Sequence, residues 1–445
     1  MKKDGFYPSL FTLALPIMLQ SLIHSLVNMV DTLMVGNLGT VEIAAVGLGN
    51  QVFFLLNMIL FGISSGAAVF TAQYWGKKDL AGLRRTVAFS LVLVLAVSAI
   101  FSLTCFLLPR HVIALYSRDP LVIAAGAAYL RAVSPCFIPF ALSLTLTIIL
   151  RTTERVRLSM SATIISLTLN VLLNYLLIFG FGPIPAMGIV GAAIATVVSR
   201  CVEALIILVI SRARRYEIVT GLAPYVRPDP VFAARYMHVA FPVMANELLW
   251  GLGITLQSVI FGRTDTNALA AFNITNVVSN LTWVYYIGLA NGASVLIGKK
   301  IGEGNQGLAR DWAFRCVKIS VLTAPILAGI LIVLKYTIPS FFNITDEALT
   351  YMGSFFILLA IAYPFRSFNI SMVIGVCRAG GDTRFCIVYD LVFMWLFALP
   401  GAAIAAFVCH AAPWVIYLLV VSEEALKVSL GYARLKSGKW LHDVT

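Results

Sequence analysis

Residues 10–35 read LFTLALPIMLQSLIHSLVNMVDTLMV, an apolar stretch long enough to cross a lipid bilayer as a helix. One ionisable carboxylate, Asp31, lies well inside this hydrophobic run. A charged group at that depth is costly unless it is paired or hydrated, and it usually marks a pathway for ions or substrate. The stretch therefore predicts a membrane-spanning helix that carries a functional carboxylate.

The same apolar character runs through the whole chain. The 445 residues are 60% hydrophobic and 12% charged, with a mean hydropathy of +0.92. A soluble protein could not bury so much apolar surface, whereas a polytopic membrane protein exposes it to lipid. We predict an all-α polytopic membrane protein with twelve transmembrane helices, at residues 10–35, 46–73, 86–109, 121–150, 157–180, 188–211, 236–262, 270–298, 312–337, 351–377, 384–407 and 410–433.

The net charge of +12 follows a topological pattern. Most Lys and Arg residues lie at the termini and in loops on one side of the predicted membrane, such as Lys77, Lys78 and Arg84, and few, such as Arg110, lie on the other. This positive-inside distribution predicts a multi-pass protein of the cytoplasmic (inner) membrane with both termini in the cytoplasm. The charge thus reports orientation, and we expect no nucleic acid partner.

The chain contains an internal duplication. A shift of 226 residues aligns residues 14–86 with 240–312 without a gap, and 18 of the 73 pairs are identical. Shared hydrophobicity does not explain identities such as Pro16/Pro242, Asn50/Asn276, Gly62/Gly288, Gly66/Gly292 and Arg84/Arg310. The period spans six helices, so both copies enter the membrane in the same direction. The halves should then be related by a pseudo-twofold axis along the membrane normal, with a cavity between them.

The longest cytoplasmic connection divides the two copies. Residues 211–235 are rich in proline and arginine, as expected for a linker. We expect an N-terminal six-helix lobe at residues 1–211, a cytoplasmic linker at 212–235 and a C-terminal six-helix lobe at 236–445. Two such bundles are typical of transporters that alternate access to a site near the middle of the membrane.

Polar side chains recur at helical spacing on the first, fifth, seventh and eighth predicted spans, where they indicate a hydrated interior. The fifth span carries Asn170 and Asn174 on one face. We expect the other polar and aromatic residues of these stripes to line a substrate cavity: Gln20, His24, Asn28, Glu247, Trp250, Gln257, Asn273, Asn276, Asn280 and Trp283.

Each of these residues also has a structural interpretation. Amides such as Asn28, Asn50 and Asn280 commonly serve only to hydrogen-bond one helix to another. His24 is either a packed imidazole or a titrating group, and Glu247 lies near the end of its span, where a capping role is the alternative. Further acidic residues lie in or near spans: Glu203, Asp390, Glu423 and Glu424.

Short motifs, in order along the chain, carry a resemblance to a known family. They are Pro16 with Val30-Asp31-Thr32 and Val35-Gly36, then Asn170–Gly180, Gly188–Thr196 and Arg378–Arg384. Over essentially its full length the chain resembles the multidrug and toxic-compound extrusion (MATE) family. The resemblance implies a V-shaped pair of six-helix lobes that exports small organic cations or amphipathic molecules across the lipid bilayer, driven by H⁺ or Na⁺. It implies no cofactor, and we expect a monomer.

The resemblance also implies where the coupling ion binds. The family's N-terminal lobe builds this H⁺ or Na⁺ site from a first-span Asp, two polar fifth-span positions and a sixth-span Thr, which here are Asp31, Asn170, Asn174 and Thr196. Relatives carry a second Asp at the position of Asn174, so this chain lacks one negative charge. Carboxylate and amide oxygens suit Na⁺, and a single desolvated carboxylate can also carry a proton. The coupling ion stays open between the two.

The predicted function is that of a secondary active antiporter that works by alternating access, and not that of an enzyme. No metal-ligand cluster, nucleophile–base pair or cofactor motif is visible, and the seven cysteines occur singly. A flippase for lipid-linked saccharides is the alternative, and it would need interior cations such as Arg131 or Arg366 to hold a pyrophosphate. A major-facilitator carrier is disfavoured, because residues 74–79 do not match the motif that those carriers have between their second and third spans.

Overall fold

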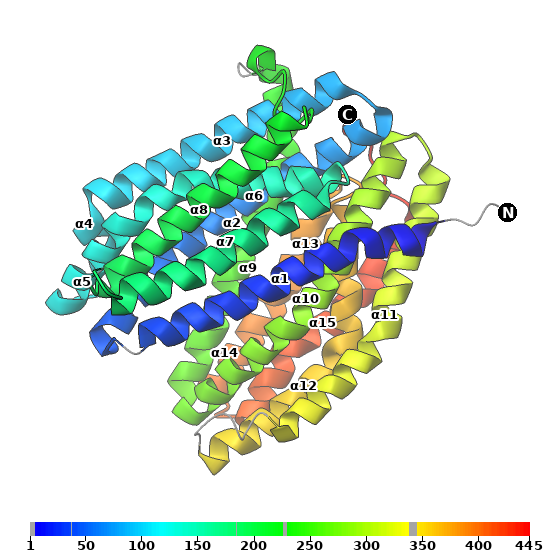
Figure 1. Ribbon diagram of the computed structural model, residues 1–445. Helices are drawn as coiled ribbons and strands as arrows, with labels where there is room; N and C mark the ends of the chain where they lie inside the picture. The colour runs from blue at the N-terminus through cyan, green and yellow to red at the C-terminus, as the bar shows by residue number, and fades with distance from the viewer. Residues whose placement is uncertain (1–4, 37, 184, 226–228, 338–344) are drawn as a thin grey trace. The chain divides into compact units, whose positions relative to one another are not determined.

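The computed structural model describes residues 5–36, 38–183, 185–225, 229–337 and 345–445. In these ranges the chain is all-α, which confirms the predicted fold class. Helices are expected here because hydrocarbon offers no partner for a free backbone N–H or C=O. The helices in Figure 1 are α1 (Phe6–Gly36), α2 (Thr40–Lys77), α3 (Leu80–Leu107), α4 (Pro109–Ala114), α5 (Pro120–Val133), α6 (Phe137–Thr152), α7 (Val156–Phe179), α8 (Gly188–Ala213), α9 (Pro230–Thr264), α10 (Thr266–Gly302), α11 (Gln306–Thr337), α12 (Asp346–Ile370), α13 (Thr383–Phe393), α14 (Leu399–Phe407) and α15 (Pro413–Ser437).

Eleven helical segments of the described chain are long and apolar enough to cross a membrane. One of them, Pro120–Thr152, joins α5 to α6 through the 3₁₀ turn Ser134–Cys136. The twelfth predicted span, 410–433, falls on α15. That helix has 25 residues, but it carries three ionisable side chains in its middle: Glu423, Glu424 and Lys427. The chain is a polytopic membrane protein in which α15 is unusually charged.

The helices form two compact units. Unit 2 comprises Leu19–Met244, and unit 1 comprises Met1–Met18 with Ala245–Thr445. Both boundaries fall inside long helices, after Met18 in α1 and after Met244 in α9. These two methionines are 226 residues apart, so they are equivalent positions of the repeat. Unit 1 therefore holds the first part of α1 and the last part of α9, and unit 2 holds the last part of α1 and the first part of α9.

A close helix crossing occurs at equivalent positions in both units. It is built in unit 2 by Gly62, Gly66, Ala240 and Met244, and in unit 1 by Gly288, Gly292, Ala14 and Met18. A Cβ added to any of these glycines would meet the crossing helix. Small residues let helix backbones approach closely in a membrane, where lipid supplies no hydrophobic driving force for association. The glycines identified by the repeat therefore determine helix packing.

The loop after each glycine-bearing helix also has the same form in both units. Lys78 and Gly304 are equivalent, and both have left-handed backbone, with φ of 60° and 75°. The next residue caps the following helix through its side-chain oxygen. Asp79 Oδ1 accepts from the backbone N–H of Gly82 at 3.0 Å, and Asn305 Oδ1 accepts from that of Leu308 at 3.1 Å.

Stacked aromatic rings fill the core of unit 1. Phe261 stacks on Phe272 with ring centroids 4.6 Å apart, and Phe355 stacks on Tyr417 at 4.4 Å. All four rings are almost fully buried. Aromatic side chains bury large areas with few rotatable bonds, so they give this core a defined packing.

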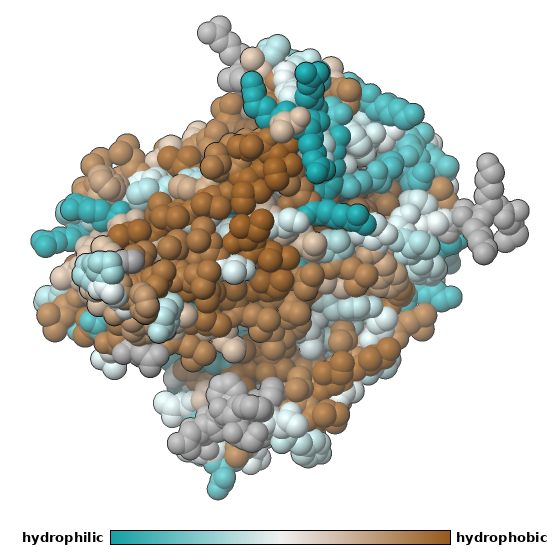
Figure 2. All heavy atoms as spheres, in the orientation of Figure 1, coloured by the Kyte–Doolittle hydropathy of each residue, from teal (hydrophilic) through white to brown (hydrophobic). Residues whose placement is uncertain are grey.

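The outer surface of unit 2 is apolar along α3, α7 and α8. Its exposed side chains include Ile100, Leu103, Leu172, Leu205 and Val209. Figure 2 shows a broad hydrophobic face along these helices, with hydrophilic side chains gathered where α8 ends. A face of this size and composition is expected of helices that contact lipid.

Candidate functional site

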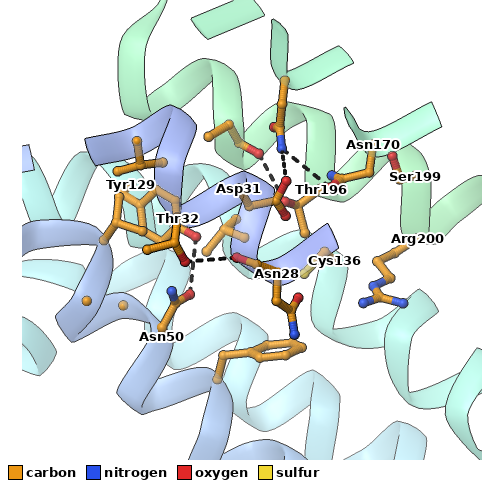
Figure 3. Close-up of a pocket in the computed structure, with 18 of the residues that line it drawn as sticks. Asn28, Asp31, Thr32, Asn50, Tyr129, Cys136, Asn170, Thr196, Ser199 and Arg200 are labelled. Atoms are coloured by element: carbon orange, nitrogen blue, oxygen red, sulfur yellow. Dashed lines mark hydrogen bonds between the residues drawn. The ribbon is translucent and has the colours of Figure 1, made fainter. Parts of the chain in front are cut away.

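Polar residues of unit 2 line one cavity of about 530 Å³, and three helices contribute most of them. The second part of α1 contributes His24, Asn28 and Asp31, α7 contributes Asn170 and Asn174, and α8 contributes Thr196, Ser199 and Arg200. In Figure 3 the side chains of Asp31, Asn170 and Thr196 point toward one another. The structure thus places the four residues of the expected ion site, and two of the expected substrate cavity, on one internal surface.

The Asp31 carboxylate is held by the amide of Asn174. Asn174 Nδ2 donates to Asp31 Oδ1 at 2.7 Å and lies 3.4 Å from Asn170 Oδ1. Asn174 is only 2% exposed, and its own Oδ1 is buried without a hydrogen-bond partner. A buried amide oxygen normally has a donor or a cation beside it. The asparagine at this position therefore orients the carboxylate and still offers an unused oxygen.

Thr196 adds another oxygen to the same surface. Its hydroxyl donates to the backbone carbonyl of Ala192 at 3.0 Å, which leaves the hydroxyl oxygen able to accept. Asp31, Asn170, Asn174 and Thr196 together offer one carboxylate with amide and hydroxyl oxygens. Oxygen ligands of this kind suit a hard cation, and the carboxylate alone can take a proton.

A chain of hydrogen bonds runs from the cavity into the interior of unit 2. Arg200 pairs with Glu203 at 2.8 Å, and Glu203 accepts from the hydroxyl of Thr163 at 2.7 Å. Thr163 in turn accepts from Gln20 Nε2 at 2.7 Å, and Gln20 Oε1 accepts from Arg151 at 2.7 Å. Gln20 is 8% exposed and belongs to this chain rather than to the cavity lining.

His24 joins this chain to the cavity. Its Nε2 lies 3.5 Å from Arg200 Nη2, and its Nδ1 lies 3.1 Å from Asn28 Nδ2. Both neighbours are donor nitrogens, and a neutral imidazole accepts at only one ring nitrogen, so the tautomer of His24 decides which of the two contacts is a hydrogen bond. Glu203 neutralises Arg200. Among the described residues that line the cavity, Asp31 is the one carboxylate, and it lies beside uncharged amides.

A family model described as MatE matches the chain twice, over residues 16–176 and 242–404. The two matches begin 226 residues apart, which is the period of the internal repeat, and together they cover most of the chain. The chain belongs to the MatE family.

The relatives of this MatE-family chain are similar over nearly their whole length. A protein of Rhizobium meliloti (strain 1021) named "Probable multidrug resistance protein NorM" is 25% identical over 98% of this chain and 95% of its own. "Multidrug resistance protein MdtK" of Yersinia pseudotuberculosis is 23% identical over 95% of this chain and 94% of its own.

Solved structures of MATE transporters share the fold. A MATE structure in complex with MaL6 matches with a TM-score of 0.89 and 18% identity, and it covers 99% of each chain. An outward-facing multidrug resistance MATE transporter of the MOP superfamily matches with a TM-score of 0.88 and 18% identity, over 97% of this chain and 96% of its own.

Arg200 was not included in the site predicted from the sequence of this MatE-family chain, and Glu203 was noted only as an acidic residue in or near a span. Arg200 lines the cavity, and Glu203 lies behind it, 3% exposed. Thr196, Arg200 and Glu203 are spaced by four and three residues, which is the same helical spacing that marked the stripe on α1. The sixth span therefore carries a polar stripe that its spacing could have revealed.

Tyr129 is a third addition to the site. Its hydroxyl lies 3.5 Å from Asn50 Oδ1, and both residues line the cavity. Asn50, which the sequence suggested as helix-to-helix glue, thus makes such a contact and also faces the internal space. A tyrosine within an apolar helix gives no periodic signal, so nothing in the sequence distinguished Tyr129 from a core aromatic.

The other expected substrate residues lie in unit 1. Glu247 pairs with Arg378, and Trp283 lies beneath the guanidinium of Arg366, 4.3 Å from its ring centroid. Trp250 packs against the core of unit 1 and Gln257 is 4% exposed. On α10, Asn273 and Asn280 are exposed and Asn276 is half-buried. None of these residues lines the cavity of unit 2.

Proposed function

We propose that this MatE-family protein is a secondary active antiporter that exports cationic or amphipathic organic compounds in exchange for H⁺ or Na⁺. The names of its relatives as multidrug resistance proteins support the class. The observation that carries the proposal is Asp31, a membrane-embedded carboxylate on a cavity of about 530 Å³, beside the buried Asn174 oxygen that has no partner. A carboxylate in that position can bind a cation and respond to its gradient.

The proposed mechanism is alternating access with competition at Asp31. In the outward-open state Asp31 takes up H⁺ or Na⁺ and loses its net charge, so an organic cation held nearby is released. In the inward-open state the ion leaves and drug rebinds against the carboxylate and the aromatic rings of the cavity, such as Phe53 and Tyr129. Each ligand shifts the balance of conformations by its differential affinity, so the coupling is reciprocal.

The two repeat copies are proposed to act as the moving lobes, at residues 1–211 and 236–445, joined by the linker at 212–235. We place the protein in the cytoplasmic membrane with both termini in the cytoplasm, on the distribution of Lys and Arg. The internal repeat supports the assignment of the lobes, since a duplicated bundle is the usual basis of alternating access.

The lipid-linked saccharide flippase is not favoured. It would need interior cations free to hold a pyrophosphate. Arg131 Nε donates to the carbonyl of Phe106 at 3.2 Å, and Arg366 is engaged by Ser279 at 2.9 Å and by Glu424 at 3.8 Å. Both candidate arginines already have partners of their own.

The decisive experiment measures efflux of a fluorescent organic cation from proteoliposomes. A pH gradient and a Na⁺ gradient are imposed separately on the wild-type protein and on Asp31→Asn. We expect one gradient to drive transport in the wild type, which names the ion, and we expect the variant to fall to the level of protein-free liposomes. Undiminished gradient-driven transport by folded Asp31→Asn would overturn the proposal.

A further inference from the structure

A second group of ionisable side chains lies inside unit 1, far along the sequence from Asp31. Lys427 Nζ of α15 lies 3.3 Å from Asp390 Oδ1 of α13 and 3.5 Å from Glu423 Oε1 of its own helix. Glu424, the next residue along α15, lies 3.8 Å from Arg366 Nε of α12. We call these five residues the α15 cluster.

Amide and phenol groups surround the α15 cluster. Asn246 Nδ2 donates to Asp390 Oδ2 at 3.1 Å, and Asn369 Nδ2 donates to Glu424 Oε2 at 2.7 Å. Tyr389 donates to the side-chain oxygen of Asn369. The helices change to π-helix just after these contacts, at Ser371–Cys377 and Met394–Ala398, a backbone feature that is common at functional sites.

The charges of the α15 cluster do not balance. Asp390, Glu423 and Glu424 supply three carboxylates, against the two cations Lys427 and Arg366. The adjoining pair of Glu247 and Arg378 is neutral as a whole, and neither α14 nor the π-helix Met394–Ala398 contributes an ionisable group. One negative charge is therefore uncompensated, in a region where an unpaired charge is strongly disfavoured.

An unpaired carboxylate oxygen on Glu423 indicates where the excess negative charge is compensated. Glu423 is 7% exposed, and its Oε2 is buried without a hydrogen-bond partner, while Oε1 faces Lys427. Asn246, tied to Asp390, also has a buried side-chain oxygen without a partner. A proton on Glu423 Oε2 would remove the excess charge and provide a donor that this carboxyl otherwise lacks.

We propose that the α15 cluster of unit 1 is a second proton-binding site, which holds one exchangeable proton on Glu423 and is separate from Asp31. The proton comes from water and returns to water, and no other group is consumed. A proton is the fitting cation here, because it needs a single oxygen, whereas a metal ion needs several ligands and the Lys427 ammonium already lies 3.5 Å from Glu423 Oε1. Transport by Asp31 is not needed for the site to exist, so the two proposals can fail independently.

The test is pH-difference infrared spectroscopy of the purified protein in an Asp31→Asn background, which removes the other candidate carboxyl. We expect a carboxylic acid carbonyl band that disappears as the pH rises and that is absent in Glu423→Gln. The band should be the same in Na⁺ and in choline buffer. A band that survives in Glu423→Gln, no titrating band at all, or displacement of the band by Na⁺ would each overturn the proposal.

Charge variants test the same site without changing Glu423. Lys427→Met removes a cation, so the band should persist to a pH about 1–3 units higher, and Glu424→Gln removes a carboxylate, so the band should disappear at lower pH. Lys427→Arg preserves the charge and serves as the matched control. If the pH of disappearance is the same in Lys427→Met and Glu424→Gln as in the parent, Glu423 does not sense the cluster and the proposal is wrong. Thermal unfolding of every variant checks that the fold is retained.

Discussion

The two units share the residues that pack helices and differ in the residues that carry chemistry. Gly62 and Gly288 occupy equivalent crossings, and Lys78 and Gly304 equivalent turns. At the position of Asp31, however, the second copy has Gln257. The carboxylates of unit 1 come instead from α13 and α15, outside the aligned part of the repeat. The helix crossings and turns are therefore common to both units, whereas the ionisable groups described here differ between them.

The largest effect is expected from moving the Asp31 carboxylate to the equivalent position of the other repeat copy, Gln257. This change tests whether the carboxylate functions only in unit 2. Asp31→Asn should lose gradient-driven transport, and adding Gln257→Asp should not restore it. The reason is that Asn174 and Thr196, which supply the neighbouring oxygens, surround Asp31 alone. Efflux from proteoliposomes measures both variants, with size-exclusion chromatography to verify folding. Recovery in the double variant would mean that the two copies are interchangeable in chemistry as well as in packing.

The second prediction concerns the buried ion pair behind the cavity of unit 2. Arg200→Met leaves Glu203, which is 3% exposed, without its cation, and removal of one partner of a buried pair typically costs about 3–5 kcal/mol. Adding Glu203→Gln removes the orphaned charge, so the double variant should recover most of the loss. Thermal unfolding in detergent compares the two. Equal destabilisation by the single and double variants would contradict an electrostatic role for the pair.

The third prediction compares the two glycine crossings. A Cβ at Gly62 would meet backbone atoms of Met244, which cannot move aside, whereas at Gly288 the nearest atom belongs to the flexible side chain of Met18. Gly62→Ala should therefore cost about 1–3 kcal/mol, as overpacking does, and Gly288→Ala should cost less. The control is Gly329→Ala on α11, where the added Cβ meets nothing within 4 Å.

The control should be neutral or stabilising, because an alanine at an open helical position restricts the unfolded chain and favours the helix. All three alanine variants are measured by thermal unfolding in the same detergent. If Gly288→Ala proves as harmful as Gly62→Ala, the two crossings are equally tight and the asymmetry argued from backbone and side-chain contacts is wrong.

The smallest effect is expected at the left-handed turns. Lys78 holds a backbone conformation, φ of 60°, that costs a residue with a Cβ about 1 kcal/mol, whereas its equivalent Gly304 adopts φ of 75° freely. Lys78→Gly should raise the unfolding temperature slightly, and Gly304→Lys should lower it by a similar amount. Changes of the same sign in both variants would show that side-chain contacts, and not backbone conformation, decide stability at these turns.

The sequence predicted the helices well, because hydrophobic length and helical spacing are local properties. The repeat also identified the glycines of the crossings, although not what they pack against. The prediction of a membrane span was weaker at α15. Three ionisable residues in the middle of this helix distinguish it from the eleven segments that are apolar enough to cross a membrane. Arg366 of α12 pairs with Glu424 and Asp390 of α13 pairs with Lys427, and a pairing between distant segments leaves no local periodic signal.

The sequence alone therefore determined the membrane class, the all-α fold and the duplication, and it indicated Asp31 as the candidate ion-binding carboxylate. Only the tertiary structure decided that Asn174 orients that carboxylate, that Arg200 and Glu203 neutralise each other beside it, and that unit 1 gathers an excess of negative charge around Lys427. The physical reason is the range of each effect. Hydropathy and helical period act along the chain, whereas the charge balance of a buried site depends on which helices the fold brings together.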